Sequence, residues 1–166
     1  MKKTYKILIL GASYGSLLGA KLLLAGHDVT LVCLPAEGYA GDVPLALAHQ
    51  WWQSGHAALV DVRTQAERDW VGYVPGTLVI PWKLYPGMAL NADFDALLLS
   101  QLPKNQPVIF LCRSGVRSIG AARRACELGY PQAYNILEGF EGDPDGRQQR
   151  GHVNGWRHAG FPWVQG

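Results

Sequence analysis

Short apolar runs alternate along the chain with longer stretches that carry helix start and stop signals. The runs at 57–62 and 108–111 are apolar at nearly every position, which is typical of parallel strands buried on both faces. This alternation predicts an α/β fold, a parallel sheet with helices on both faces. Strands are predicted at 6–10, 29–34, 57–62, 77–80, 108–111 and 133–137, and helices at 16–25, 44–54, 64–71, 93–102, 118–128 and 154–159.

Capping residues mark several of these helices. Pro44 stands in the first turn of one helix, and Gly55 follows its end. Thr64 and Glu67 have the spacing of a capping box. Between the regular elements, residues 35–41 are predicted to be a linker and residues 139–151 an exposed loop, because both are rich in turn-forming residues.

Composition narrows the classes of protein that fit. The 166 residues suit one ordinary domain; 48% are hydrophobic and 17% charged, which is globular composition. The net charge of +2 is spread along the chain, with no basic run for nucleic acid and no basic amphipathic helix for a membrane surface. No apolar run is long enough to span a bilayer, and the N-terminal apolar stretch is too interrupted for a secretory signal.

Cysteine and histidine usage bears on the compartment of the protein and on metal binding. The three cysteines, Cys33, Cys112 and Cys126, argue against a disulfide framework and fit a reducing compartment, so a cytoplasmic protein is expected. The histidines lack metal-ligand spacing. No metal and no cofactor are expected.

The segment from Val108 to Ser118 carries the clearest chemistry. A buried strand leads into Cys112, a tight loop follows, and a helix begins. Ligands of open α/β sheets bind at the carboxyl ends of strands, and a helix N-terminus directs backbone N–H groups at an anion. The N–H groups and the charges of Arg113 and Arg117 would favour the Cys112 thiolate, the reactive form of cysteine.

The sequence Cys-Arg-Ser-Gly-Val-Arg-Ser at 112–118 resembles the active-site loop of single-domain rhodaneses, and four further segments agree with that family in type and order. In the second of these, Tyr73 replaces the usual His. The resemblance covers about residues 41–163. The four segments are Leu59-Val60-Asp61-Val62-Arg63, Gly72-Tyr73-Val74-Pro75-Gly76-Thr77, Tyr134-Asn135-Ile136-Leu137-Glu138-Gly139, and Asn154-Gly155-Trp156 to Pro162-Trp163.

The resemblance implies a rhodanese-like fold and a thiosulfate sulfurtransferase-like activity. Cys112 would be the catalytic nucleophile and would carry sulfur as a persulfide. The donor would be a small anion such as thiosulfate, and the acceptor cyanide, a thiol or a protein. The arginines would hold the oxyanion of the donor. The expected substrate-binding residues are Arg113, Ser114, Gly115, Val116 and Arg117.

Three further residues are expected to support the loop. Asp61 and Arg63 end a neighbouring strand, so they should lie near the same edge of the sheet. Asp61 would accept hydrogen bonds that set the Cys112 loop, and Arg63 would pair with an acid such as Glu67. Ser118 follows the loop directly. For Arg63, a purely stabilising ion pair is the alternative.

Two other functions are compatible with this reading. A Cys-dependent phosphatase of the same fold needs a longer loop than the four residues between Cys112 and Arg117, because phosphate is larger than a sulfur atom. A rhodanese-like module that binds a partner without turnover would have no need of Cys112 and both arginines.

Residues 6–34 resemble the first βαβ unit of a Rossmann dehydrogenase of the ketopantoate reductase or octopine dehydrogenase type. Ser13 replaces the second glycine, no acid follows the second strand, and the other Rossmann strands are missing. We therefore expect a structural segment at 1–36 that binds no dinucleotide, followed by a rhodanese domain at 37–166. The strands of the N-terminal segment would pair with the rhodanese sheet or with a second copy of the chain, and the second arrangement would give a homodimer.

Overall fold

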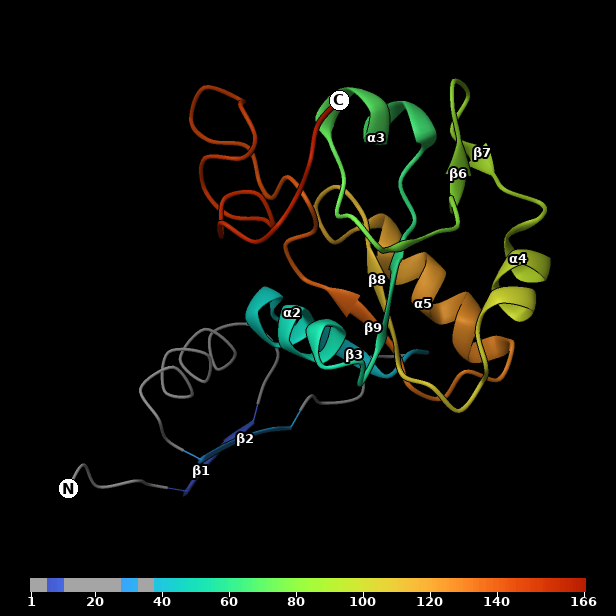
Figure 1. Cartoon of the computed structure of the whole chain (residues 1–166), viewed down its shortest axis with the longest axis vertical. Helices are drawn as coiled ribbons and strands as arrows, with labels where there is room; N and C mark the ends of the chain where they lie inside the picture. The colour runs from blue at the N-terminus through green and yellow to red at the C-terminus, as the bar shows by residue number, and fades with distance from the viewer. Residues whose placement is uncertain (1–5, 11–27, 33–37) are drawn as a thin grey trace.

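The computed structural model describes residues 6–10, 28–32 and 38–166 (Figure 1). Its centre is a five-stranded sheet in the order β3-β9-β8-β4-β5, and every pair of neighbours is parallel. The predicted α/β fold class is confirmed. The strands are β3 (Gly41–Val43), β4 (Ala58–Asp61), β5 (Leu78–Val79), β8 (Val108–Leu111) and β9 (Ala133–Ile136); the helices are α2 (Leu45–Gln53), α3 (Gln65–Val71), α4 (Phe94–Gln101) and α5 (Arg117–Glu127).

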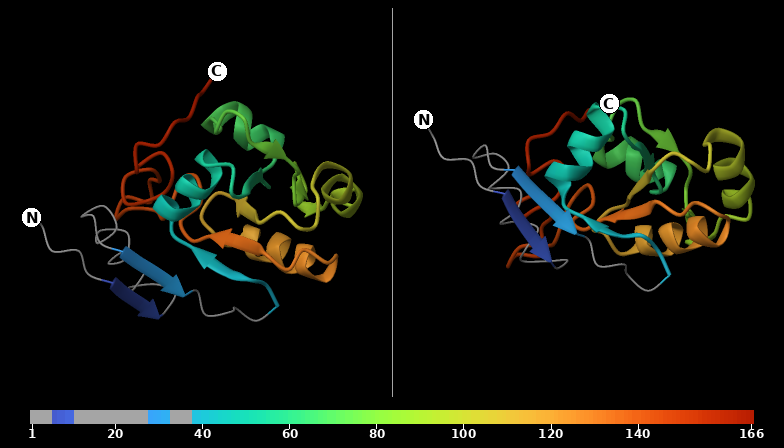
Figure 2. Two further views of the ribbon diagram at one scale, coloured as in Figure 1. Left: turned by 60° about the horizontal axis from the view of Figure 1, so that its bottom comes forward. Right: turned by 90° about the horizontal axis from the view of Figure 1, so that it is seen from below.

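Helices cover both faces of the sheet (Figure 2). Successive side chains of a strand point to opposite faces. Val108 and Phe110 of β8 accordingly belong to a core that contains α4 and α5, whereas Ile109 and Leu111 belong to a core that contains α2. All four are fully buried, which explains the continuous apolar run in the sequence.

The boundaries predicted for α2, α3, α4 and α5 agree with the structure to within one or two residues. Pro44 is the N-cap residue of α2. The capping box of α3 is confirmed: the Thr64 side chain accepts a hydrogen bond from the Glu67 backbone N–H, and the Glu67 carboxylate accepts one from the Thr64 N–H. Gly129 follows the end of α5 with a positive φ of 93°, the left-handed conformation that glycine adopts without strain.

Three elements differ from the prediction. Strand β3, next to the expected linker, is too short to leave a pattern, and pairing with β9 defines it. A small antiparallel hairpin, β6 (Lys83–Leu84) and β7 (Ala89–Leu90), was also missed. The helix predicted at 154–159 is wrong, because these residues form turns in which the Trp156 N–H donates to the Gly139 carbonyl at 2.9 Å.

The N-terminal strands β1 (Lys6–Leu10) and β2 (Asp28–Val32) form a separate two-stranded parallel sheet. The prediction that they would pair with the main sheet is wrong for the strands that the structure describes, because β3 takes the edge next to β9. Their pairing with a second copy stays a prediction. The Rossmann-like turn and helix at 11–27 lie outside the described residues.

Within the described part of the chain, no helix is long and apolar enough to cross a membrane.

Candidate active site

Cys112 lies at the carboxyl end of β8, in the interior of the sheet. Residues 113–116 then form a tight loop, and α5 starts at Arg117. The Cys112 side chain is buried, with 1% of the residue exposed. Strand β8 and the loop that leads into α5 therefore meet at Cys112.

A second loop, which follows β9, is hydrogen-bonded to the backbone of the Cys112 loop. The Phe140 N–H donates to the Cys112 carbonyl at 2.8 Å, and the Glu141 N–H donates to the Arg113 carbonyl at 2.9 Å. Gly139 has a φ of 65°, and a Cβ there would lie 2.6 Å from the Cys112 carbonyl oxygen. Glycine is required because the two backbones approach so closely.

Ser118, in the first turn of α5, contacts the sulfur directly. Its Oγ lies 3.0 Å from the Cys112 Sγ and 2.5 Å from the Asn135 Oδ1. The Asn135 Nδ2 donates to the Asp42 Oδ1 at 2.8 Å, and the Tyr39 hydroxyl donates to the same oxygen at 2.8 Å. A polar chain therefore runs from the edge strand β3, across β9, to the sulfur.

Arg117 forms a two-point ion pair with Glu67 of α3. Its Nη1 donates to the Glu67 Oε2 at 2.9 Å, and its Nη2 donates to the Oε1. Burial by itself would raise the pKa of Glu67. The hydrogen bonds and charge of Arg117, together with hydrogen bonds from Thr64, instead lower this pKa to about 2. The pKa of Arg117 is raised, because the Glu67 carboxylate outweighs the opposing effect of burial, and the Cys112 sulfur adds to the rise.

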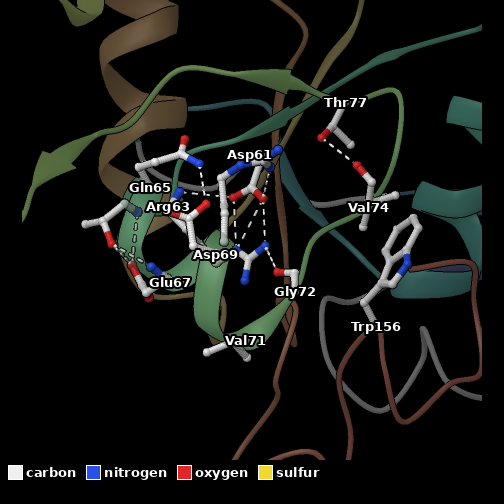
Figure 3. Close-up of polar contacts among 12 residues, drawn as sticks. Asp61, Arg63, Gln65, Glu67, Asp69, Val71, Gly72, Val74, Thr77 and Trp156 are labelled. Carbon is white, nitrogen blue, oxygen red and sulfur yellow. Dashed lines mark hydrogen bonds and ion pairs between the residues drawn. The ribbon is translucent and has the colours of Figure 1, made fainter. Parts of the chain in front are cut away.

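Asp61 and Arg63 form a different cluster (Figure 3). The Arg63 Nε and Nη2 donate to the two Asp61 carboxylate oxygens at 3.0 and 2.8 Å, and Arg68 donates to the same carboxylate at 2.8 Å. Arg63 is fully buried, also donates to the Gly72 carbonyl at 2.9 Å, and lies 4.0 Å from the ring centre of Phe140. The expected pairing of Arg63 with Glu67 is therefore wrong, because Asp61, two residues away, takes the guanidinium.

A pocket of about 680 Å³ opens above the Cys112 loop. The loop contributes Arg113, Ser114, Val116 and Arg117 to its wall. The other walls come from α3, the β6–β7 hairpin and the loop at 139–151; their lining residues include Glu67, Trp70, Tyr85, Met88 and Arg150. Four of the five predicted loop residues therefore line one hollow.

A model of the rhodanese-like domain matches residues 45–143, more than half of the chain. The chain belongs to the rhodanese-like domain family. The crystal structure of Rv0390 from M. tuberculosis superposes with a TM-score of 0.71 and 43% sequence identity, over 77% of this chain and 99% of that one.

Two curated relatives agree with this assignment. The Uncharacterized protein RP600 of Rickettsia prowazekii is 36% identical over 112 residues, which cover 66% of this chain and 85% of the relative. A protein named Sulfurtransferase from Allochromatium vinosum is 31% identical over 106 residues, which cover 64% and 77%. The matches support rhodanese and sulfurtransferase at the level of the family.

The rhodanese-like structure places the predicted site residues unequally. Arg113 and Val116 are exposed at the pocket, Ser114 and Arg117 are half-buried, and Gly115 is buried against the Leu137 carbonyl. Asp61 accepts hydrogen bonds from the arginines of its own cluster. Among the described residues it accepts none from the Cys112 loop, contrary to the expectation, because Arg63 and Arg68 occupy its carboxylate.

Several residues of the site were not predicted. Asn135 lies within a segment that carries the family resemblance, but its contact with Ser118 joins residues 17 positions apart. Trp70, Tyr85 and Arg150 come from three separate segments. Sequence spacing gave no signal for these contacts, because packing of the elements brings them together.

Proposed function

We propose that this rhodanese-like protein is a sulfurtransferase that carries sulfane sulfur on Cys112 as a persulfide. The observation that carries the proposal is the position of Cys112: it ends a central strand, lies beneath a cationic loop and starts the turn into α5. The proposal is also supported by membership of the family and by the name of the Allochromatium vinosum relative.

In the first half-reaction, the Cys112 thiolate attacks the outer sulfur of a donor such as thiosulfate. A bond forms between the Cys112 Sγ and that sulfur, and the sulfur–sulfur bond of thiosulfate breaks. Sulfite leaves with the electron pair, and Cys112 retains a persulfide anion. The charge before and after this step is the same, so no oxidant or reductant is needed.

The two arginines have different parts in this scheme. Arg117 is held by Glu67 at both ends of its guanidinium and is coupled electrostatically to Cys112, so we assign it to the sulfur anion rather than to the donor. Arg113 is exposed at the pocket, and among the described residues it forms no ion pair with a carboxylate, so it is placed to meet the sulfite oxygens. The expectation that both arginines hold the donor is revised in this way.

In the second half-reaction, a thiophilic acceptor attacks the terminal sulfur of the persulfide. The bond between that sulfur and the Cys112 Sγ breaks, and its electron pair restores the thiolate. Cyanide would leave as thiocyanate, and a thiolate would leave as a persulfide. The guanidinium groups of Arg113 and Arg117, on the loop after Cys112, would stabilise the persulfide anion between the half-reactions.

Intact mass spectrometry after thiosulfate treatment tests the proposal. The protein is expected to gain one sulfur, ~32 Da, and to lose it when cyanide is added. Cys112→Ser should gain nothing, whereas Cys126→Ser, which changes a half-buried thiol on the far part of α5, should behave like the wild type. Sulfur loading in Cys112→Ser would refute the assignment. A wild-type protein that never loads would favour the binding module.

A further inference from the structure

The pocket lined by the loop that follows Cys112 is far larger than an inorganic donor requires. Its volume of about 680 Å³ falls within the range of sites that enclose organic molecules of drug size. Thiosulfate and cyanide have only a few atoms each, so they leave most of this space unused. The remainder of the pocket is therefore available for the body of a larger substrate.

Large apolar side chains stand exposed around the mouth of this pocket. Trp70 of α3 is 69% exposed and Tyr85 of the hairpin is 60% exposed, and their rings lie edge to face with centres 6.1 Å apart. Val116, on the Cys112 loop, is 71% exposed and lines the same pocket. Burial of these side chains against a ligand would be favourable, and gathered exposed apolar groups commonly mark a binding site.

The charge at the pocket complements an anion. Arg113 and Arg150 both line it. Glu67 also lines it, but its charge is matched by Arg117. The pocket therefore combines an aromatic rim with two guanidinium groups, and guanidinium groups suit carboxylates and other oxyanions.

We propose that the acceptor is an organic thiol whose apolar body packs on Trp70 and Tyr85 and whose anionic group faces Arg113 and Arg150. This rests on the proposed sulfur transfer. The acceptor thiolate attacks the terminal sulfur of the Cys112 persulfide, a new sulfur–sulfur bond forms on the acceptor, and the electron pair of the broken bond returns to the Cys112 Sγ.

The test compares acceptors on protein loaded beforehand with thiosulfate. The loss of ~32 Da is followed by mass spectrometry with 4-mercaptophenylacetate, 3-mercaptopropionate, cysteamine or cyanide as acceptor. Trp70→Ala and Tyr85→Ala should each slow discharge by 4-mercaptophenylacetate about tenfold and change cyanide discharge less than about twofold. Leu99→Ala, which removes an exposed apolar side chain from α4, is the matched control and should change neither rate.

The charge is tested in the same way. Arg150→Gln should slow both mercapto acids and leave cysteamine, a cation, unchanged. Equal effects of Trp70→Ala on all four acceptors would overturn the inference. If the wild type does not load sulfur, or cyanide does not remove it, the proposed function itself fails, and that result is distinct from the acceptor comparison.

Discussion

The cluster of Asp61, Arg63 and Arg68 and the pair of Glu67 and Arg117 both involve residues of α3, yet their surroundings differ. Asp61 and Arg63 are fully buried, and their hydrogen bonds join β4, α3 and the turn at Gly72. Glu67 and Arg117 are half-buried and line the pocket. The same kind of interaction therefore holds the fold together in one place and shapes the site in the other.

The difference shows what decides the role of an ion pair here. A charge enclosed by protein is costly to leave without its partner, so the first cluster mainly affects whether the chain folds. A pair at the edge of a pocket keeps some access to solvent and acts on its neighbours, here the Cys112 sulfur. Substitutions should separate the two effects.

The largest effect on stability is expected from Asp61→Ala. The substitution leaves two guanidinium groups, of which Arg63 is fully buried, without their carboxylate. A loss of about 3–5 kcal/mol in the free energy of unfolding is expected. Urea unfolding measures it. Asp69→Ala, which removes an exposed carboxylate from α3, is the control, and a similar loss in both variants would contradict the comparison.

Acid should weaken the second pair. The pKa of Glu67 lies at about 2 in the folded protein against the usual 4.5, so ionised Glu67 stabilises the fold above pH 4.5 and this contribution is lost as the pH falls toward 2. At about 1.4 kcal/mol per pH unit, the contribution is about 3 kcal/mol at most. Urea unfolding at several pH values should show this loss in the wild type and not in Glu67→Gln. Parallel curves would argue against the ion pair.

Substitution of Arg113 and of Arg117 should have different effects on two reactions of Cys112, turnover of thiosulfate and alkylation. Arg113→Ala should lower kcat/KM for thiosulfate about tenfold, the scale of one charge-assisted contact, and leave alkylation of Cys112 by neutral iodoacetamide unchanged. Arg117→Ala should slow both reactions, because the charge beside the sulfur is lost. If Arg117→Ala affects thiosulfate alone, Arg117 contacts the donor after all.

The smallest change concerns Thr64, the N-cap residue of α3, which carries Glu67 and Arg68. Thr64→Ala removes the side chain that caps α3 and also donates to the Glu67 carboxylate. A loss of about 1 kcal/mol in the free energy of unfolding is expected. Thermal or urea unfolding measures it, and Thr64→Ser should restore most of the loss because the hydroxyl is kept. Full loss in Thr64→Ser would mean that packing of the methyl group, not capping, is responsible.

Much of the fold follows from local features of the sequence. The fully apolar run at β8, the capping box at Thr64 and the glycine after α5 act through residues that are neighbours in the chain, so their effect is visible in the sequence. The short strand β3 and the β6–β7 hairpin have only two or three residues in each strand, and pairing with another segment defines them. The turns at 154–159 show the opposite error, in which a plausible helical segment is held in another shape by long-range contacts.

The candidate site divides in the same way. The sequence by itself determined that Cys112 follows a buried strand and precedes a helix with two arginines nearby, because these relations span only a few residues. Only the tertiary structure decided that Arg63 binds Asp61, that Arg117 binds Glu67 across 50 positions, and that Asp42 reaches Cys112 through Asn135 and Ser118. The strength of an ion pair or hydrogen bond depends on distance, direction and burial in space, and these are fixed when the elements pack.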